Sequence, residues 1–174
     1  MAEIKNPEDT LLMETTKGKV VIELLPDLAP GHVARIKELA REGAYDGVVF
    51  HRVIDGFMAQ TGDVQYGDMK DGYDAGAVGT GGSELPDLPA EFSKRARFTR
   101  GVVGMARAQS PDSANSQFFI MFGPAPTLDG DYTIVGKVES GMELVDAIKK
   151  GEEARNGVVS EPDRMIKVRI AADK

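Results

Sequence analysis

The stretch FHRVIDGFMAQTGD, from Phe50 to Asp63, decides how the rest of the chain is interpreted. Val48 to Ile54 is rich in β-branched and aromatic residues, which favours a strand. Gly56 can absorb a bend before a second short extended run, Phe57 to Thr61. The sequence therefore predicts two short strands joined at a sharp turn.

Alternation within these strands predicts that a cation and apolar groups meet in one place. Residues two apart in a strand share a face, so Met58 and Gln60 point the same way. By the same rule Arg52 shares a face with Ile54. A bend at Asp55-Gly56 would gather these groups around a shallow pocket, which suits a ligand with an apolar ring beside a carbonyl group. The simpler alternative is an amphipathic strand with a solvated arginine, and composition alone favours that alternative.

Length and charge limit the possible classes of protein. A chain of 174 residues fits one domain with a real core. Its net charge of −7 is unfavourable for binding a phosphate backbone, so we expect no nucleic-acid partner. One local basic cluster is interpreted as a solvated face: Lys94, Arg95, Arg97 and Arg100.

Residue types that are scarce or absent limit the chemistry further. The chain has no cysteine and only two histidines, so we expect no disulfide, no metal centre and no cofactor. No apolar run is long enough to span a membrane, and the N-terminus does not resemble a secretory signal. The simplest location is the cytoplasm, and nothing in the sequence indicates more than a monomer.

The remaining pattern predicts short strands and two helices. Residues 1–9 are polar, so a short flexible tail is expected before a single domain over 10–174. Apolar residues at helical spacing predict one helix over Pro30–Arg41 and a shorter one over Gly141–Lys150. Further strands are predicted at Thr10–Thr16, Lys19–Leu25, Gly101–Arg107, Gln117–Phe122, Tyr132–Val138 and Met165–Ala171.

The order of these elements indicates the fold class. A long glycine-rich stretch, about residues 64–97, is predicted to be an irregular loop. Strands and helices do not alternate as they do in a parallel sheet. A mostly antiparallel barrel with helices over its open ends therefore fits better.

The predicted strand Gln117–Phe122 carries aromatic residues on both faces. Phe118 and Ile120 share one face, and Phe119 and Met121 share the other. One face can fill a core while the other presents Phe119 to a site.

The catalytic motifs of hydrolases and metalloproteases are absent. The chain has no GxSxG elbow and no HExxH, and His51 is more readily explained as a structural residue than as a general base. What remains is a cation, amides and apolar side chains. Rotation about an Xaa-Pro bond needs nothing more, because it breaks no covalent bond and its barrier comes from amide resonance. A cation that favours the pyramidal prolyl nitrogen, beside a dry apolar pocket, would lower that barrier.

Five motifs, in the family's order and spacing, resemble the cyclophilins, which are peptidyl-prolyl cis–trans isomerases. They are FHRVIDGFMAQTGD (Phe50–Asp63), GTGG (Gly79–Gly82), GVVGMARA (Gly101–Ala108), NSQFFIMF (Asn115–Phe122) and LDGDYTIVGKV (Leu128–Val138). The likeness covers roughly residues 10–172. It implies a mainly β fold, a closed eight-stranded antiparallel β-barrel capped by two α-helices, with the site on its outer surface.

The resemblance also implies roles for single residues. Arg52 matches the catalytic arginine, which would hydrogen-bond the substrate carbonyl and the developing lone pair on the prolyl nitrogen, and Gln60 matches the glutamine that holds it. Matches to the substrate-binding residues are Phe57, Met58, Phe119 and Leu128 in the walls of the proline pocket, Gln117 at its edge, Tyr132 closing it, and Gly79, Ala106, Arg107 and Ala108 in the neighbouring groove. Backbone groups at Arg107 would hold the peptide extended.

Three positions depart from common members of the family. Thr127 stands where eukaryotic members commonly carry a tryptophan that helps to bind cyclosporin, so we expect weakened cyclosporin binding with activity kept. Tyr132 replaces a common histidine, and its aromatic ring can still close the pocket. Arg107 replaces a common asparagine, which could alter the preference for residues near the proline. The choices at Thr127 and Tyr132, with PDLPAEFS (Pro86–Ser93), look bacterial.

Three functions are compatible with these observations. The first is an isomerase that acts on proline-containing peptides and on unfolded or flexible proteins, and so assists folding. The second is a binding module, a holdase or adaptor, that keeps the groove but catalyses little. The third is a structural or small-ligand barrel with a likeness in fold alone. The joint presence of Arg52, Gln60 and Phe119 favours the enzyme.

Overall fold

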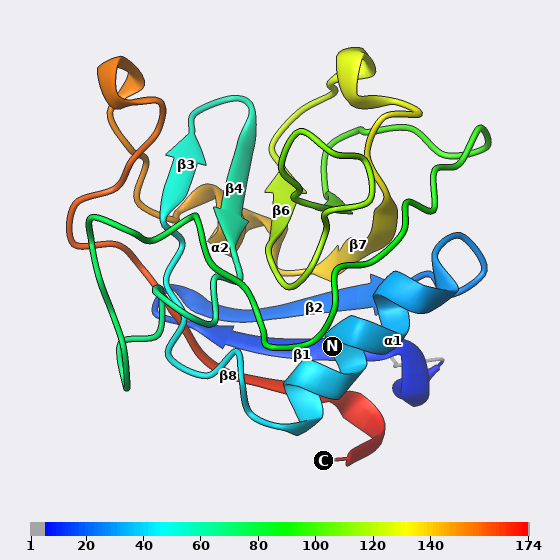
Figure 1. The fold of residues 1–174 in the computed structure, drawn as a ribbon, viewed down its shortest axis with the longest axis horizontal. Coiled ribbons are helices and arrows are strands. Elements are labelled where there is room, and N and C mark those ends of the chain that lie inside the picture. Colours follow the sequence, from blue (N-terminus) through cyan, green and yellow to red (C-terminus); the bar gives the residue numbers. More distant parts are fainter. Residues whose placement is uncertain (1–5, 174) are drawn as a thin grey trace.

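Eight strands form one antiparallel sheet in the computed structural model, which describes residues 6–173 (Figure 1). The neighbour order in the sheet is β3-β4-β6-β5-β7-β2-β1-β8. The strands are β1 (Thr10–Thr15), β2 (Gly18–Leu24), β3 (Arg52–Ile54), β4 (Met58–Thr61), β5 (Val102–Met105), β6 (Phe118–Met121), β7 (Ile134–Ser140) and β8 (Met165–Ile170). In Figure 1, β1, β2 and β8 lie below β3, β4 and β6, so the curled sheet encloses a core.

Two α-helices accompany the sheet, as the sequence predicts. The first, α1 (Pro30–Arg41), has the predicted bounds and packs against β8, and the second, α2 (Met142–Asp146), packs against β2. The predicted span of the second helix, Gly141–Lys150, is too long. The amide groups of Ala147 and Ile148 bond three residues back, to Leu144 and Val145, so the helix ends in tight turns.

The predicted closed barrel is wrong, because the sheet is open between its edge strands β3 and β8. In the described residues no continuous ladder crosses this seam. It is crossed by isolated bridges, among them Val49 to Arg164, and by separate backbone hydrogen bonds such as Val53 N–H to the carbonyl oxygen of Gly157 at 2.8 Å. The segment beside β3 cannot form a regular strand, because Asn156 and Glu161 have positive φ angles of 57° and 49° and Pro162 lacks an amide donor. The predicted strand Val48–Ile54 is shortened to β3 for the same reason.

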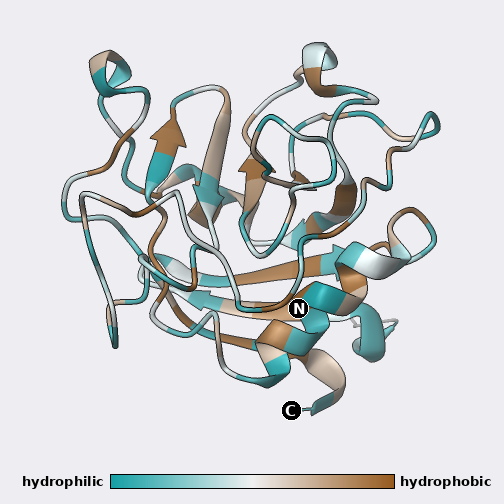
Figure 2. Ribbon diagram, viewed as in Figure 1, coloured by the Kyte–Doolittle hydropathy of each residue, from teal (hydrophilic) through white to brown (hydrophobic). Residues whose placement is uncertain are grey.

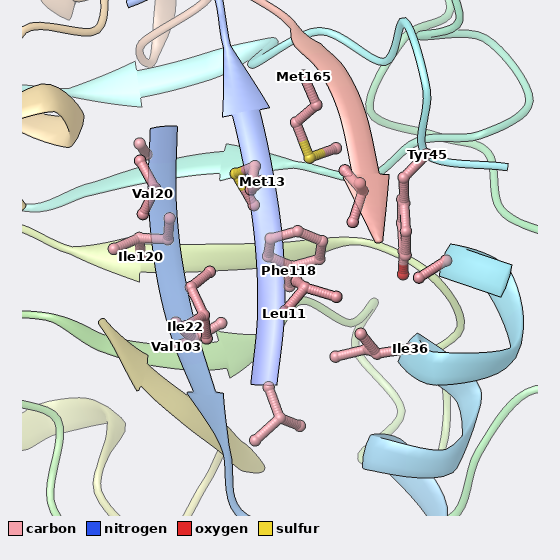
Figure 3. Close-up of a cluster of buried hydrophobic side chains, with 14 of the residues drawn as sticks. Leu11, Met13, Val20, Ile22, Ile36, Tyr45, Val103, Phe118, Ile120 and Met165 are labelled. Carbon is pink, nitrogen blue, oxygen red and sulfur yellow. The ribbon is translucent and has the colours of Figure 1, made fainter. Parts of the chain in front are cut away.

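Apolar side chains fill the inside of the curled sheet. Figure 2 shows brown, hydrophobic segments on β1 and β2, while the connecting loops are mostly teal and white. Figure 3 shows Leu11, Met13, Ile22 and Phe118 converging there with Ile36 of α1. These five side chains are at most 1 % exposed. This inner core is what holds the strands in register beneath the site.

A short turn precedes β1. Within the expected flexible tail, Pro7–Asp9 form one turn of 3₁₀ helix, and residues 1–5 lie outside the described residues. Glu8 contacts Lys37 and Arg41 of α1 at 2.8 Å each, so opposite charges dock this turn onto the helix. Within residues 6–173, no helix is both long enough and apolar enough to cross a membrane.

Candidate active site

The hairpin of β3 and β4 places a cation and an amide opposite each other. Gly56, at φ 75°, supplies the left-handed turn between the strands. Arg52 then pairs with Gln60 across the hairpin, and its Nη1 donates a hydrogen bond to Gln60 Oε1 at 3.3 Å. Gln60 in turn lies opposite Phe119 of β6. The register of three strands therefore brings Arg52, Gln60 and Phe119 to the outer face of the sheet.

A shallow pocket of about 150 Å³ opens on this outer face. The residues that line it come from strands β3, β4 and β6 and from the loops after β5 and before β7. All nine belong to the set expected from the sequence: Arg52, Phe57, Met58, Gln60, Ala106, Arg107, Phe119, Leu128 and Tyr132. The pocket thus joins two arginine side chains, one amide and one phenol group to apolar walls.

The floor of the pocket is a short stack of aromatic rings. Phe119 is 4 % exposed, stacks on Phe98 with centroids 5.6 Å apart, and meets the ring of Tyr132 edge to face at 5.9 Å. Gly104 is required beneath this stack, since a Cβ there would lie 2.5 Å from Phe98 and 2.7 Å from Phe119. The ring of Phe119 is therefore fixed from below and from the side.

Arg52 is held by hydrogen bonds to two residues, Gln60 and Asn156, and remains partly exposed to the pocket. Besides its bond to Gln60, its Nε donates to the carbonyl oxygen of Asn156 at 3.0 Å, and its Nη2 donates to Asn156 Oδ1 at 3.2 Å. Burial lowers the pKa of Arg52 below its ordinary value, and the neighbouring Tyr132 acts in the opposite direction. An arginine stays charged at neutral pH nonetheless, so the pocket holds a fixed cation.

A chain of amide groups connects this cation to the glycine-rich loop. Gln60 Nε2 donates to Gln117 Oε1 at 2.9 Å, and Gln117 Nε2 donates to the carbonyl oxygens of Gly79 and Gly81 at 3.0 and 2.9 Å. Each amide both donates and accepts, so the orientation of Gln60 follows from the position of the loop.

A second hollow of about 350 Å³ continues from the pocket across this loop. Gln60, Ala106 and Arg107 line both hollows. The second one adds the three remaining expected residues, Gly79, Ala108 and Gln117. The two neighbouring hollows are therefore lined by all twelve catalytic and substrate-binding candidates that the resemblance implies.

Comparison with known proteins identifies the family. Residues 10–170 match the family model described as cyclophilin type peptidyl-prolyl cis-trans isomerase/CLD. A probable peptidyl-prolyl cis-trans isomerase of Brucella suis biovar 1 is 64 % identical over 172 residues, which cover 99 % of this chain and 87 % of that protein. The chain belongs to the cyclophilin-type peptidyl-prolyl cis–trans isomerases.

Other relatives agree with this placement. Peptidyl-prolyl cis-trans isomerase B of Bacillus subtilis is 39 % identical over 135 residues, covering 78 % of this chain and 86 % of that protein. The crystal structure of cyclophilin AquaCyp293 from Hirschia baltica superposes with a TM-score of 0.79 at 28 % identity, covering 97 % of this chain and 76 % of that one. The predicted resemblance to bacterial cyclophilins is confirmed.

Two residues that help to build this cyclophilin site were given no role from the sequence. Asp63 is fully buried, and its carboxylate accepts four backbone N–H groups, from Gln65, Tyr66, Gly79 and Gly81, at 2.7–3.0 Å. Asn156 holds Arg52. The Asn156-Gly157 dipeptide is a turn signal, but a turn signal does not reveal which side chain the turn will meet.

His51 lies beneath the glycine-rich loop rather than in the pocket. It is 6 % exposed, and a Cβ on Gly79 would come within 3.2 Å of its Nε2. Burial lowers its pKa to about 4, although the carboxylate of Asp63 acts in the opposite direction. The imidazole is therefore neutral at pH 7, and it supports the loop. In the described part of the chain, no cluster of three or more His, Cys, Asp or Glu side chains could hold a metal ion.

Proposed function

We propose that this isomerase accelerates rotation about Xaa-Pro bonds through Arg52, which stabilises the twisted amide electrostatically. The observation that carries the proposal is the number of free donors on Arg52. A guanidinium has five N–H groups, and three of them are bonded to Gln60 and Asn156, which leaves one on each terminal nitrogen. These two can serve a substrate carbonyl and the prolyl nitrogen.

The proposed mechanism follows from how the amide changes as it twists. A planar Xaa-Pro amide delocalises the nitrogen lone pair, and rotation by a right angle returns that pair to a pyramidal nitrogen. A hydrogen bond from Arg52 to this lone pair exists only in the twisted state, so it lowers the barrier instead of tightening the ground state. Because the apolar walls exclude water, the charge acts more strongly there than it would in bulk solvent.

The apolar walls have the complementary task of holding the ring. Phe119, Met58 and Leu128 line the pocket, and a pyrrolidine ring in contact with them would be fixed while the peptide on the other side of the bond turns. Because the pocket is shallow and lies at the surface, we expect its substrates to be extended, proline-containing segments of unfolded or flexible proteins.

The edge at Arg107 supplies a place for the extended part of such a segment. Among the hydrogen bonds of residues 6–173, none uses the backbone N–H or carbonyl of Arg107. An unpaired backbone edge can bind a peptide as an added strand does, through main-chain hydrogen bonds that are independent of the peptide's sequence.

Arg52→Ala tests the mechanism. We expect the exchange rate of a short Xaa-Pro peptide, measured by NMR, to fall by about 10²–10³-fold, the range found when one preorganised donor to a transition state is removed. Peptide affinity should change far less. Arg52→Lys is the matched control, because it keeps the charge but not the forked geometry, and it should recover little of the rate.

Two results would contradict the mechanism. If Arg52→Ala retained the wild-type exchange rate, the cation would not be the catalytic group. If the intact protein bound the peptide without accelerating its exchange, the chain would act as a proline-binding module, which is the alternative function.

A further inference from the structure

The side chain of Arg107 connects two segments that border the proline pocket. One is the irregular chain that follows β5, and the other is the turn that precedes β7. Arg107 is the second residue of the first segment, and Asp131 and Tyr132 lie near the end of the second. The backbone N–H of Met105 bonds to the carbonyl oxygen of Thr133 at 2.9 Å and joins the two segments at the end of the sheet. Beyond that bond, no backbone hydrogen bond in the described residues joins Arg107 itself to the turn.

The guanidinium of Arg107 binds main-chain carbonyl groups on both segments. Its Nε and Nη2 donate to the carbonyl oxygen of Asp131 at 3.1 and 2.9 Å. Its Nη1 donates to the carbonyl oxygens of Ala108 and Gln109 at 3.0 and 3.1 Å. Hydrogen bonds from a charged donor are stronger than neutral ones, and a planar guanidinium can make several at once.

The same group stacks on a wall of the pocket. The Cζ atom of Arg107 lies 4.4 Å from the centroid of the Tyr132 ring, within the range of a cation–π interaction. The same ring also forms the edge-to-face pair with Phe119. A continuous line of contacts therefore runs from Arg107 through Tyr132 to the pocket floor.

These contacts leave little of the guanidinium for a substrate. Four of its five N–H groups are engaged by the carbonyls of Ala108, Gln109 and Asp131. By contrast, the backbone N–H and carbonyl of Arg107 are unbonded within the described residues. The residue thus presents its main chain to the groove while its side chain is committed to the protein.

We propose that the side chain of Arg107 is a positioning residue, which sets the peptide-binding edge at its own backbone in fixed register with the Tyr132 and Phe119 walls. The inference rests on the proposed function, because it assumes that a substrate engages the edge and the proline pocket together. A peptide that must reach both sites binds well only if their separation matches its own backbone repeat. Without the hydrogen bonds of the Arg107 side chain, the two segments could move apart. Part of the free energy of peptide binding would then be spent on ordering them again.

The test compares Arg107→Ala with the wild-type protein in peptide binding and in exchange. We expect the dissociation constant and KM for an Xaa-Pro peptide to rise about tenfold, equivalent to about 1.4 kcal/mol, with kcat changed less than threefold. Arg107→Lys keeps the charge but cannot reach both segments or stack, so it should restore less than half of the lost affinity. Arg100→Ala is the matched control. It removes another arginine with a two-pronged contact, to Asp146 at 2.9 and 2.6 Å outside the pocket, and should leave KM unchanged.

A double-mutant cycle separates a positioning role from a general structural one. If Arg107 acts through Tyr132, the affinity losses of Arg107→Ala and Tyr132→Leu should be less than additive. If Arg107 only stabilised the fold, Arg107→Ala would lower the unfolding midpoint and leave KM at the wild-type value below that midpoint. That outcome, full rescue by lysine, or additive losses would each overturn the proposal.

The outcome does not depend on the role of Arg52. The proposed mechanism fails if Arg52→Ala keeps its exchange rate, whereas the Arg107 proposal fails if Arg107→Ala keeps its affinity. Peptide titration by NMR measures the second quantity even where exchange is slow.

Discussion

The two faces of β6 are almost equally buried but do different things. Phe118 and Ile120 on the inner face are 1 % and 0 % exposed, and Phe119 and Met121 on the outer face are 4 % and 0 % exposed. The inner residues belong to a thick core shared with β1, β2, β8 and α1. The outer residues belong to a thin layer of six buried side chains whose rim carries Tyr132 and Leu128. Fractional burial alone thus fails to separate the core from the site, because the difference lies in what covers each face.

The largest effect should come from removing one aromatic ring on each face. Phe118→Ala would leave a cavity in closed packing, where Phe118 meets the Tyr45 ring at 5.5 Å, and should cost about 3–5 kcal/mol of unfolding free energy. Phe119→Ala should cost less, about 1–3 kcal/mol, because solvent can enter from the pocket. Its kcat/KM should fall about tenfold or more, as the ring-binding surface is lost. Urea unfolding and peptide exchange measure the two quantities.

The comparison fails if the two variants behave alike. Equal losses of stability, or a Phe118→Ala protein that is folded yet as inactive as Phe119→Ala, would show that the faces are coupled rather than divided between stability and binding.

The second prediction concerns the pH dependence of stability, in which His51 and Arg52 should differ. The two are neighbours in sequence, but their side chains lie on opposite faces of the extended chain. With a pKa of about 4 in the folded protein against 6.5 in the unfolded chain, His51 takes up its proton in the unfolded state first. The stabilisation that neutral His51 gives to the folded state is complete above pH 6.5. It is lost as the pH falls toward 4, which lowers the free energy of unfolding by about 3 kcal/mol. Arg52 stays charged throughout this range.

The measurement is the free energy of unfolding of the wild-type protein and of His51→Gln between pH 7 and pH 4. Carboxylates titrate in both proteins, so their effects cancel in the difference. We expect the gap between the two curves to shrink by about 3 kcal/mol as the pH falls. A constant gap would mean that His51 has the same pKa in the folded and unfolded states, contrary to its burial.

The smallest effect should come from Asn156, a loop residue that accepts two hydrogen bonds from Arg52. Asn156→Gly keeps access to the left-handed backbone at φ 57° and removes only the Oδ1 contact, so kcat should fall about three- to tenfold. Asn156→Ala removes the same contact and adds about 1 kcal/mol of backbone strain. The pair should therefore match in kcat and differ in unfolding midpoint. A glycine variant with wild-type kcat would show that the backbone carbonyl alone orients Arg52.

The sequence predicts most of the fold because turns and alternation are local signals. The bounds of α1 follow from Pro30 at its start and Gly43 just beyond its end, and the two faces of β6 follow from period two alone. Barrel closure is not local. It depends on whether the chain at residues 156–163 can pair beside β3, and the φ angles of Asn156 and Glu161 leave no trace in the hydrophobic pattern.

The site shows the same limit. The residues that line the pocket were expected because their motifs resemble those of the cyclophilins. Asp63 was not, because its task is to bind backbone N–H groups of a loop sixteen and eighteen residues away, at Gly79 and Gly81. The periodicity of a sequence does not predict which backbone N–H groups a buried carboxylate will bind. Asn156 is the corresponding case for Arg52.

The seam between β3 and β8 has a consequence for when the protein becomes active during synthesis. The first strand, β1, pairs with the last, β8, with Leu11 opposite Ile170, and Asn156 reaches Arg52 only from the chain that leads into β8. Contacts between the two ends of a chain are the slowest to form and cannot precede translation of both ends. During synthesis Arg52 can therefore bond to Gln60 within the β3–β4 hairpin before Asn156 has been made. The isomerase would then complete the hydrogen bonds around Arg52 only after the segment that leads into β8 has been made.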